Sequence, residues 1–126
     1  MKIVVNTPNA PAPIGPYSQA IVAGNLIFVS GQIALHPVSG ELRITDIETE
    51  TKQVMENIGA ILKQAGTDFN FIVKTSIFLK DMQDFAKVNE IYGTYFKDQF
   101  PARETIQVAG LPKNVNVEIS VTAIKP

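Results

Sequence analysis

Two charged residues in the C-terminal third of the chain, Arg103 and Glu118, have the chemistry of an anion site. Arg103 is one of only two arginines and follows Phe100-Pro101-Ala102, where the proline fixes the backbone before a predicted strand. A planar guanidinium offers paired donors that match a carboxylate. A carboxylate such as that of Glu118 can hold or deprotonate a water molecule. Together the two residues could bind a small anion and activate water beside it.

Both residues lie in segments that alternate polar and apolar side chains, which is typical of half-buried strands. We expect one strand over 103–108 and another over 115–124. If these strands pair antiparallel with apolar side chains matched, Arg103 and Glu118 become diagonal neighbours about 7 Å apart on one face. That geometry fits an ordinary cross-strand salt bridge as well as a site for a small anion. The spacing does not decide between the two interpretations.

The N-terminal half predicts a lead-in, a hairpin and a long helix. Four of the eight prolines fall within residues 6–16, which excludes helix and central strand there. Gly24-Asn25 separates two short apolar runs and is typical of a tight hairpin turn. A helix is expected from about Thr45, whose spacing to Glu48 matches a capping box, to a stop at Gly66.

The remaining pattern completes a single domain over residues 1–126. A strand is expected over 71–79, followed by a helix that starts near Asp81 or Asp84 and ends before Pro101. The order predicts an α+β fold, a single sheet with two helices on one face. Segments such as 26–29 are apolar on both faces, so the second face needs a cover. We expect other subunits of a homo-oligomer to supply it, with partial coverage by the lead-in as the alternative.

Composition narrows the function classes. The chain has no cysteine and a single histidine, His36, which argues against a metal site and excludes thiolate chemistry. Its net charge is −1, with 11 basic and 12 acidic residues, so no partner is expected among nucleic acids or anionic membranes. No stretch approaches the ~20 apolar residues of a membrane span. We expect a soluble, cytoplasmic protein.

Short segments in a fixed order carry a family resemblance. They include Gly15-Pro16-Tyr17-Ser18-Gln19-Ala20, Phe28-Val29-Ser30-Gly31-Gln32-Ile33, Val88-Asn89-Glu90-Ile91-Tyr92, Pro101-Ala102-Arg103 and Val117-Glu118-Ile119. In combination they resemble the reactive-intermediate (imine/enamine) deaminase family, of Rid or YjgF type, over nearly the whole chain. The resemblance implies a chorismate-mutase-like fold of the trimeric type, assembled as a homotrimer with clefts between subunits.

The resemblance also implies a reaction and its residues. Family members hydrolyse 2-imino acids such as 2-iminobutanoate, and enamines such as 2-aminoacrylate, to 2-keto acids and ammonia without a cofactor. By the match, Arg103 would clamp the substrate carboxylate and Glu118 would position the attacking water. The cleft would be lined by Tyr17 of a neighbouring subunit, Ser30, Gly31 and Thr105, with Asn89 at its margin. Without the resemblance, Tyr17 reads as a packing aromatic and Ser30-Gly31 as a strand bulge.

Two positions depart from the family pattern. Glu104 stands where a small residue is usual, but strand alternation aims it away from Arg103, toward an interface or a sheet face. Thr105 stands where cysteine is frequent, which leaves the pocket intact and puts substrate preference in question.

Other interpretations stay open. A non-catalytic trimeric regulatory protein that binds a small carboxylate would use Arg103 without Glu118. Ribonuclease activity has been claimed for some relatives, and the near-neutral charge argues against it. His36 is expected in a surface loop. The aromatic set Phe85, Tyr92, Tyr95 and Phe96 is expected to pack a helix.

Overall fold

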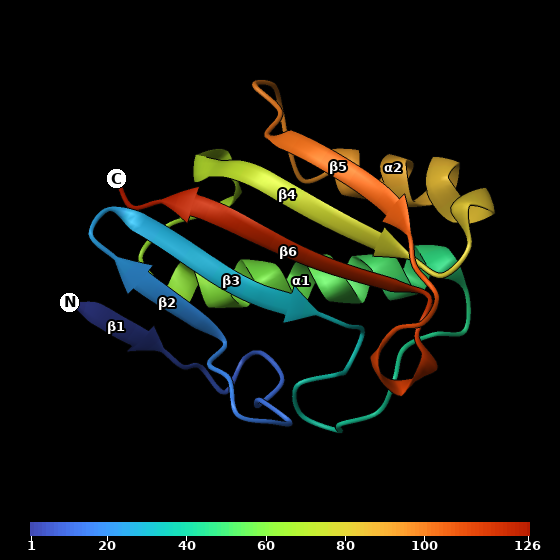
Figure 1. The fold of residues 1–126 in the computed structure, drawn as a ribbon, viewed down its shortest axis with the longest axis horizontal. Helices are drawn as coiled ribbons and strands as arrows, with labels where there is room; N and C mark the ends of the chain where they lie inside the picture. The colour runs from blue at the N-terminus through green and yellow to red at the C-terminus, as the bar shows by residue number, and fades with distance from the viewer.

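All 126 residues are described by a computed structural model, in which two helices cover one side of a six-stranded sheet (Figure 1). The strand order is β1-β2-β3-β6-β4-β5, and β4 and β5 are the parallel pair. The predicted α+β architecture is confirmed. The elements are β1 (Lys2–Val5), β2 (Ala20–Ala23), β3 (Leu26–Gln32), α1 (Ile47–Gln64), β4 (Ile72–Leu79), α2 (Phe85–Gly93), β5 (Ala102–Gln107) and β6 (Val117–Ile124), with short 3-10 turns at Phe69–Phe71, Met82–Asp84 and Pro112–Asn114.

The N-terminal strands form an antiparallel ladder. The predicted hairpin joins β2 and β3, and Gly24 takes a φ of 63°, which glycine adopts without steric cost. Strand β1 is not predicted, because its four residues run directly into the proline-rich lead-in. It adds to the edge of β2.

Helix α1 begins slightly later than the capping-box spacing predicts. The N-cap is Asp46, whose carboxylate accepts a 2.7 Å hydrogen bond from the Thr49 N–H. The hydroxyl of Thr45 donates instead to the Asp46 carboxylate at 3.3 Å, so the predicted cap at Thr45 is wrong. The helix ends before Gly66, as predicted, and Gly66 has a φ of 85°.

The C-terminal strands do not pair with each other. Strands β4 and β5 are joined through α2 as a parallel βαβ unit, which places β5 at the sheet edge beside β4. Strand β6 enters between β3 and β4 and is antiparallel to both. The predicted antiparallel pairing of the last two strands is therefore wrong, because β4 separates them.

The core lies between the sheet and α1. Alternate residues of β6 turn toward the helix and are buried there, as the sequence alternation predicts. The other core residues come from α1 and from the sides of β3 and β4 that face this helix. The fully buried large side chains include Ile27, Val54, Met55, Ile58, Ile61, Leu62, Ile77, Leu79 and Ile119.

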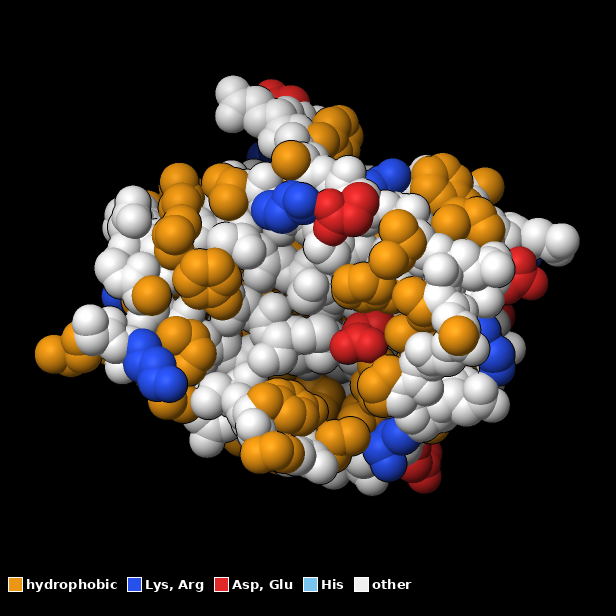
Figure 2. Space-filling view, in the orientation of Figure 1, with side chains coloured by type: hydrophobic (Ala, Val, Ile, Leu, Met, Phe, Trp, Pro, Cys, Tyr) orange, Lys and Arg blue, Asp and Glu red, His pale blue; other side chains and the backbone are white.

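The opposite face of the sheet carries no helix. Figure 2 looks onto this face, where hydrophobic side chains surround a paler, shallow centre. Leu26, Phe28 and Ile106 remain 37%, 46% and 44% exposed, so the lead-in does not cover them. We call this surface the open face. No helix of the chain combines the length and the apolarity needed to cross a membrane.

Candidate active site

The carboxylate of Glu118 reaches a cavity of about 300 Å³ beside the open face. Glu118 is the second residue of β6. Strand alternation places its side chain on the other face of the sheet from the buried Val117 and Ile119. The cavity is lined by Pro11, Ala12, Ile14, Tyr17, Gln19, Ser30, Gly31, Gln32, Ile33, Leu35, Pro112 and Glu118. Four of the seven predicted site residues thus share one cavity.

A bulge in β3 makes room for the carboxylate. The pairing register between β3 and β6 shifts between Val29 and Gln32, which puts Ser30 and Gly31 in the irregular stretch. A Cβ added to Gly31 would lie 2.9 Å from Glu118 Cδ and closer still to Oε2. Ser30-Gly31 is therefore a strand bulge that also lines the cavity.

Glu118 has no cationic partner. The one ion pair of the chain joins Lys74 to Glu104, and no side-chain hydrogen bond involves the Glu118 carboxylate. Burial alone raises the pKa of Glu118 above its ordinary value. A half-buried, unpaired carboxylate with a raised pKa is a favourable general base.

The lead-in wall of this cavity is held by hydrogen bonds. The buried amide of Gln19 accepts from the Thr7 N–H at 2.7 Å and donates to the Pro11 carbonyl at 2.9 Å. The Tyr17 phenol oxygen accepts from the Ile14 N–H at 3.3 Å, which leaves its own proton free for another partner. The Ser30 hydroxyl donates to the Ser18 carbonyl and so serves the fold.

Arg103 lies in a different cavity, of about 520 Å³, on the helix side of the sheet. Its Nη1 donates to Asn89 Oδ1 at 2.6 Å, which joins two predicted site residues. The guanidinium carbon lies 5.3 Å from the centre of the Tyr92 ring and 5.7 Å from that of Phe85. These two rings were expected only to pack, and their spacing with Asn89 at positions 85, 89 and 92 is the signal that places all three on one helix face.

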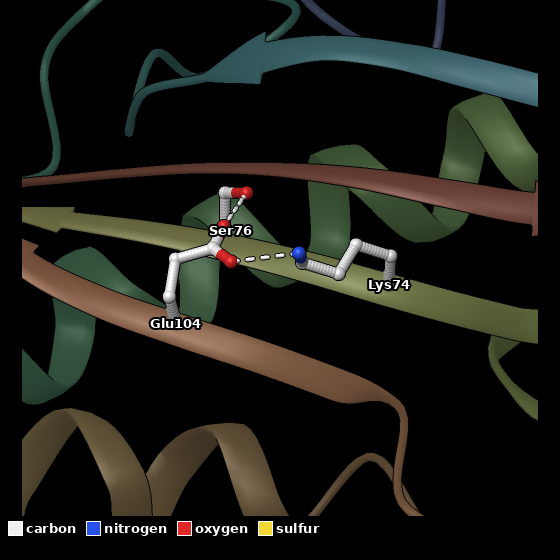
Figure 3. A network of polar contacts seen from close by, with 3 residues as sticks. All are labelled: Lys74, Ser76 and Glu104. Carbon is white, nitrogen blue, oxygen red and sulfur yellow. Dashed lines mark hydrogen bonds and ion pairs between the residues drawn. The ribbon is translucent and has the colours of Figure 1, made fainter.

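The neighbours of Arg103 on β5 follow the predicted alternation. Thr105 turns to the same side as Arg103, and its hydroxyl oxygen is buried without a partner. Glu104 turns to the open face, where it pairs with Lys74 at 2.7 Å and accepts a hydrogen bond from Ser76 (Figure 3). Hydrogen bonds from Lys74 and Ser76 hold the pKa of Glu104 below its ordinary value.

Arg103 and Glu118 consequently do not converge within one chain. Arg103 is in register with the buried Thr75 and contacts α2, whereas Glu118 is in register with Phe78 on the open face. The prediction that they are diagonal neighbours is wrong, and so is the alternative of a cross-strand salt bridge between them. The predicted residues form two half-sites: Tyr17, Ser30, Gly31 and Glu118 in one, Asn89 and Arg103 in the other.

No group of three or more histidine, cysteine, aspartate or glutamate side chains is arranged to hold a metal ion. Beside the two cavities, the side chains that can bind an anion or move a proton include the Glu118 carboxylate, the Tyr17 phenol and the Arg103 guanidinium. They can orient an anion and move a proton, which is enough for hydrolysis of an activated carbon–nitrogen double bond.

Comparison with known proteins places this geometry in context. Residues 7–125 match the protein family described as Endoribonuclease L-PSP. A mouse 2-iminobutanoate/2-iminopropanoate deaminase is 51% identical over 122 residues, which covers 97% of this chain and 90% of that protein. A Lactococcus lactis protein provisionally named as the regulator AldR is 52% identical over 123 residues, covering 98% and 97%. A crystal structure of a Rid-family protein of unknown function from Yersinia pestis is 50% identical, with a TM-score of 0.96 and coverage of 98% and 99%.

Proposed function

The chain belongs to the Endoribonuclease L-PSP family, and we propose that within it this protein is a cofactor-independent 2-iminobutanoate/2-iminopropanoate deaminase. It hydrolyses 2-imino acids and their enamine tautomers, such as 2-aminoacrylate, to 2-keto acids and ammonia. The mouse relative supports this reaction, because it is named for it and is 51% identical to this chain. We place the reaction in the cytoplasm.

The main support for the proposal is that the Glu118 carboxylate is half-buried and has no cationic partner. A carboxylate that is half-buried, free of cations and beside a small cavity is costly to keep ionised, so a structural role does not account for it. The same carboxylate can take a proton from a water molecule held near an electrophilic carbon. Apolar walls such as Ile33 and Leu35 accommodate the side chain of a short aliphatic substrate.

Arg103 supplies the recognition of the substrate carboxylate. One of its terminal nitrogens is engaged by Asn89, and the remaining donors are free to make a bidentate contact. Thr105, with a buried hydroxyl that lacks a partner, lies on the same side of the strand and offers a further polar contact.

A complete site needs both halves, and we assign them to neighbouring subunits of a homotrimer. Strand β5 is at the sheet edge, so Arg103 and Thr105 can face another protomer. The uncovered open face, with Phe28 and Ile106 partly exposed, provides an apolar surface for assembly. Each cleft would then combine Arg103, Asn89 and Thr105 of one protomer with Tyr17, Ser30, Gly31 and Glu118 of the next.

The chemistry requires no further group. A protonated imine is already electrophilic at carbon, and Arg103 would hold the adjoining carboxylate so that this carbon meets a water on Glu118. Glu118 accepts a proton as the water oxygen bonds to the carbon, which gives a carbinolamine. Return of that proton to nitrogen lets the carbon–nitrogen bond break. The Glu118 carboxylate takes the hydroxyl proton as the carbonyl forms and passes it to the departing ammonia, which is released as ammonium.

The test uses 2-iminobutanoate generated in situ by a threonine dehydratase. Wild-type protein should accelerate 2-oxobutanoate formation, and Arg103→Ala should lose about 2–3 kcal/mol of transition-state binding, since a charge-assisted contact disappears. Glu118→Gln should lose turnover and keep 2-oxobutanoate binding. Unchanged acceleration by either variant would refute the assigned role.

A regulatory function is the second candidate, favoured by the name of the Lactococcus lactis relative. In that case the protein binds a small carboxylate through Arg103 and catalyses nothing. The two functions separate on the wild-type protein, because a sensor would bind 2-oxobutanoate without any imine turnover.

A further inference from the structure

One face of α2 packs against the Arg103 guanidinium. Phe85, Asn89 and Tyr92 are spaced four and three residues apart, so they lie on the same side of the helix. Asn89 accepts a hydrogen bond from Nη1, and the guanidinium carbon lies over both rings at 5.3 and 5.7 Å. Both distances are within the reach of a cation–π contact.

The Tyr92 ring is itself held in place. It is 4% exposed, and its hydroxyl donates a 2.9 Å hydrogen bond to Thr75 Oγ1. Thr75 is fully buried on β4 and is in register with Arg103 on β5. The ring is therefore tied to the strand beside the arginine that it contacts, which fixes ring and guanidinium relative to each other.

A free arginine side chain has many rotamers, and binding a carboxylate would have to order them. Here the ordering is done before substrate arrives. The two rings do not occupy the N–H donors of the guanidinium, because a ring face attracts the cation through its quadrupole. The donors not used by Asn89 stay available to a ligand.

We infer that Phe85 and Tyr92 are positioning residues, which hold Arg103 in the orientation that receives the substrate carboxylate. The inference rests on the proposed function for the identity of the ligand. It predicts that their loss weakens binding of carboxylates generally, both imine substrate and keto-acid product, and leaves the chemical step little changed.

The test combines kinetics with product binding in three variants and one control variant. Tyr92→Leu and Phe85→Leu remove a ring and keep apolar bulk, and each should raise KM for 2-iminobutanoate and Kd for 2-oxobutanoate by about three- to tenfold, with kcat within about twofold. Tyr92→Phe keeps the ring and should restore most of the affinity. Tyr95→Leu is the matched control, because Tyr95 packs on Phe69 and not on Arg103. It should leave KM and Kd unchanged.

A direct readout comes from the side-chain Nε–Hε resonances of arginine. The chain has two arginines, and the exposed Arg43 serves as an internal reference. Arg103 should show a ring-current shift and restricted motion, both reduced in Tyr92→Leu, and should respond to 2-oxobutanoate. A mobile Arg103 in the wild type, or variants with unchanged Kd, would overturn the inference. Absent imine turnover with an ordered, 2-oxobutanoate-responsive Arg103 would instead refute the proposed function alone.

Discussion

The carboxylate of Glu118 packs against the Cα of Gly31, at a distance that leaves no space for a side chain on residue 31. Gly31 does not have a positive φ, so an alanine there meets no backbone strain. The obstruction is the carboxylate itself, and a flexible side chain can move away. Gly31 therefore sets where the Glu118 carboxylate lies.

Gly31→Ala should displace that carboxylate while the fold stays intact. We expect kcat for 2-iminobutanoate to fall by about ten- to a hundredfold, because small misplacements of a reacting group are costly. Gly110→Ala is the control, since nothing lies within 4 Å of the added Cβ. Circular dichroism and steady-state kinetics measure fold and rate; equal rates for both alanine variants would contradict the role given to Gly31.

Turnover should depend on pH through Glu118. Burial raises the pKa of this carboxyl, and a general base acts only when ionised. Log kcat/KM should therefore fall as pH decreases through an inflection above the ordinary glutamate value of 4.5. The profile should persist in His36→Asn, which removes the only histidine. If the inflection disappears in His36→Asn, the titrating group is His36 and not Glu118, which would contradict the prediction.

The effect of Glu118 on stability changes with pH in the direction opposite to its effect on turnover. A carboxyl whose folded-state pKa is raised favours the fold when protonated, so its contribution is lost as pH rises through that pKa. Glu118→Gln should raise the free energy of unfolding at pH 7 by up to about 1 kcal/mol, and the gain should vanish toward pH 4. Urea titrations at fixed protomer concentration measure it.

A buried carboxylate on α1 anchors the start of β6. Glu50 is fully buried and accepts hydrogen bonds from the N–H groups of Asn116 and Val117 at 2.7 and 3.1 Å. Glu50→Ala leaves these donors without a partner and should cost about 3 kcal/mol of stability. Glu48→Ala, at an exposed position in the same helical turn, should cost less than about 1 kcal/mol. Comparable losses in the two variants would show that Glu50 is not an anchor.

The local elements were predictable because each depends on neighbouring residues. Gly24-Asn25 specifies a turn, the apolar spacing of residues 54–62 specifies a helix, and alternation along 117–124 specifies which side chains face the core. Alternation also placed Glu104 correctly on the side away from Arg103.

The order of the strands was not predictable from such signals. Apolar residues of β5 and β6 match one another, yet those of β4 match both, and only the βαβ connection through α2 decides the neighbours. With that order unknown, Arg103 and Glu118 were placed on one face. Six of the seven predicted site residues line one of the two cavities, and their division between these cavities needed the structure.

The family description names an endoribonuclease, which makes RNA the substrate class to test. With 11 basic and 12 acidic residues, the chain offers little electrostatic attraction to a phosphate backbone. We expect no cleavage of single-stranded RNA and no binding whose affinity changes across a salt titration from about 50 to 200 mM. Fluorescence anisotropy with a labelled oligonucleotide measures this; a steep salt slope would overturn the expectation.

The division of the site between subunits can be measured by complementation. Arg103→Ala and Glu118→Gln are each expected to be inactive, and the two would be co-expressed with different affinity tags so that mixed assemblies can be purified. In a homotrimer with shared clefts, each mixed assembly contains one cleft with both native residues, so imine hydrolysis should return to about a third of the wild-type rate. Mixed assemblies as inactive as the two parents would contradict the shared site.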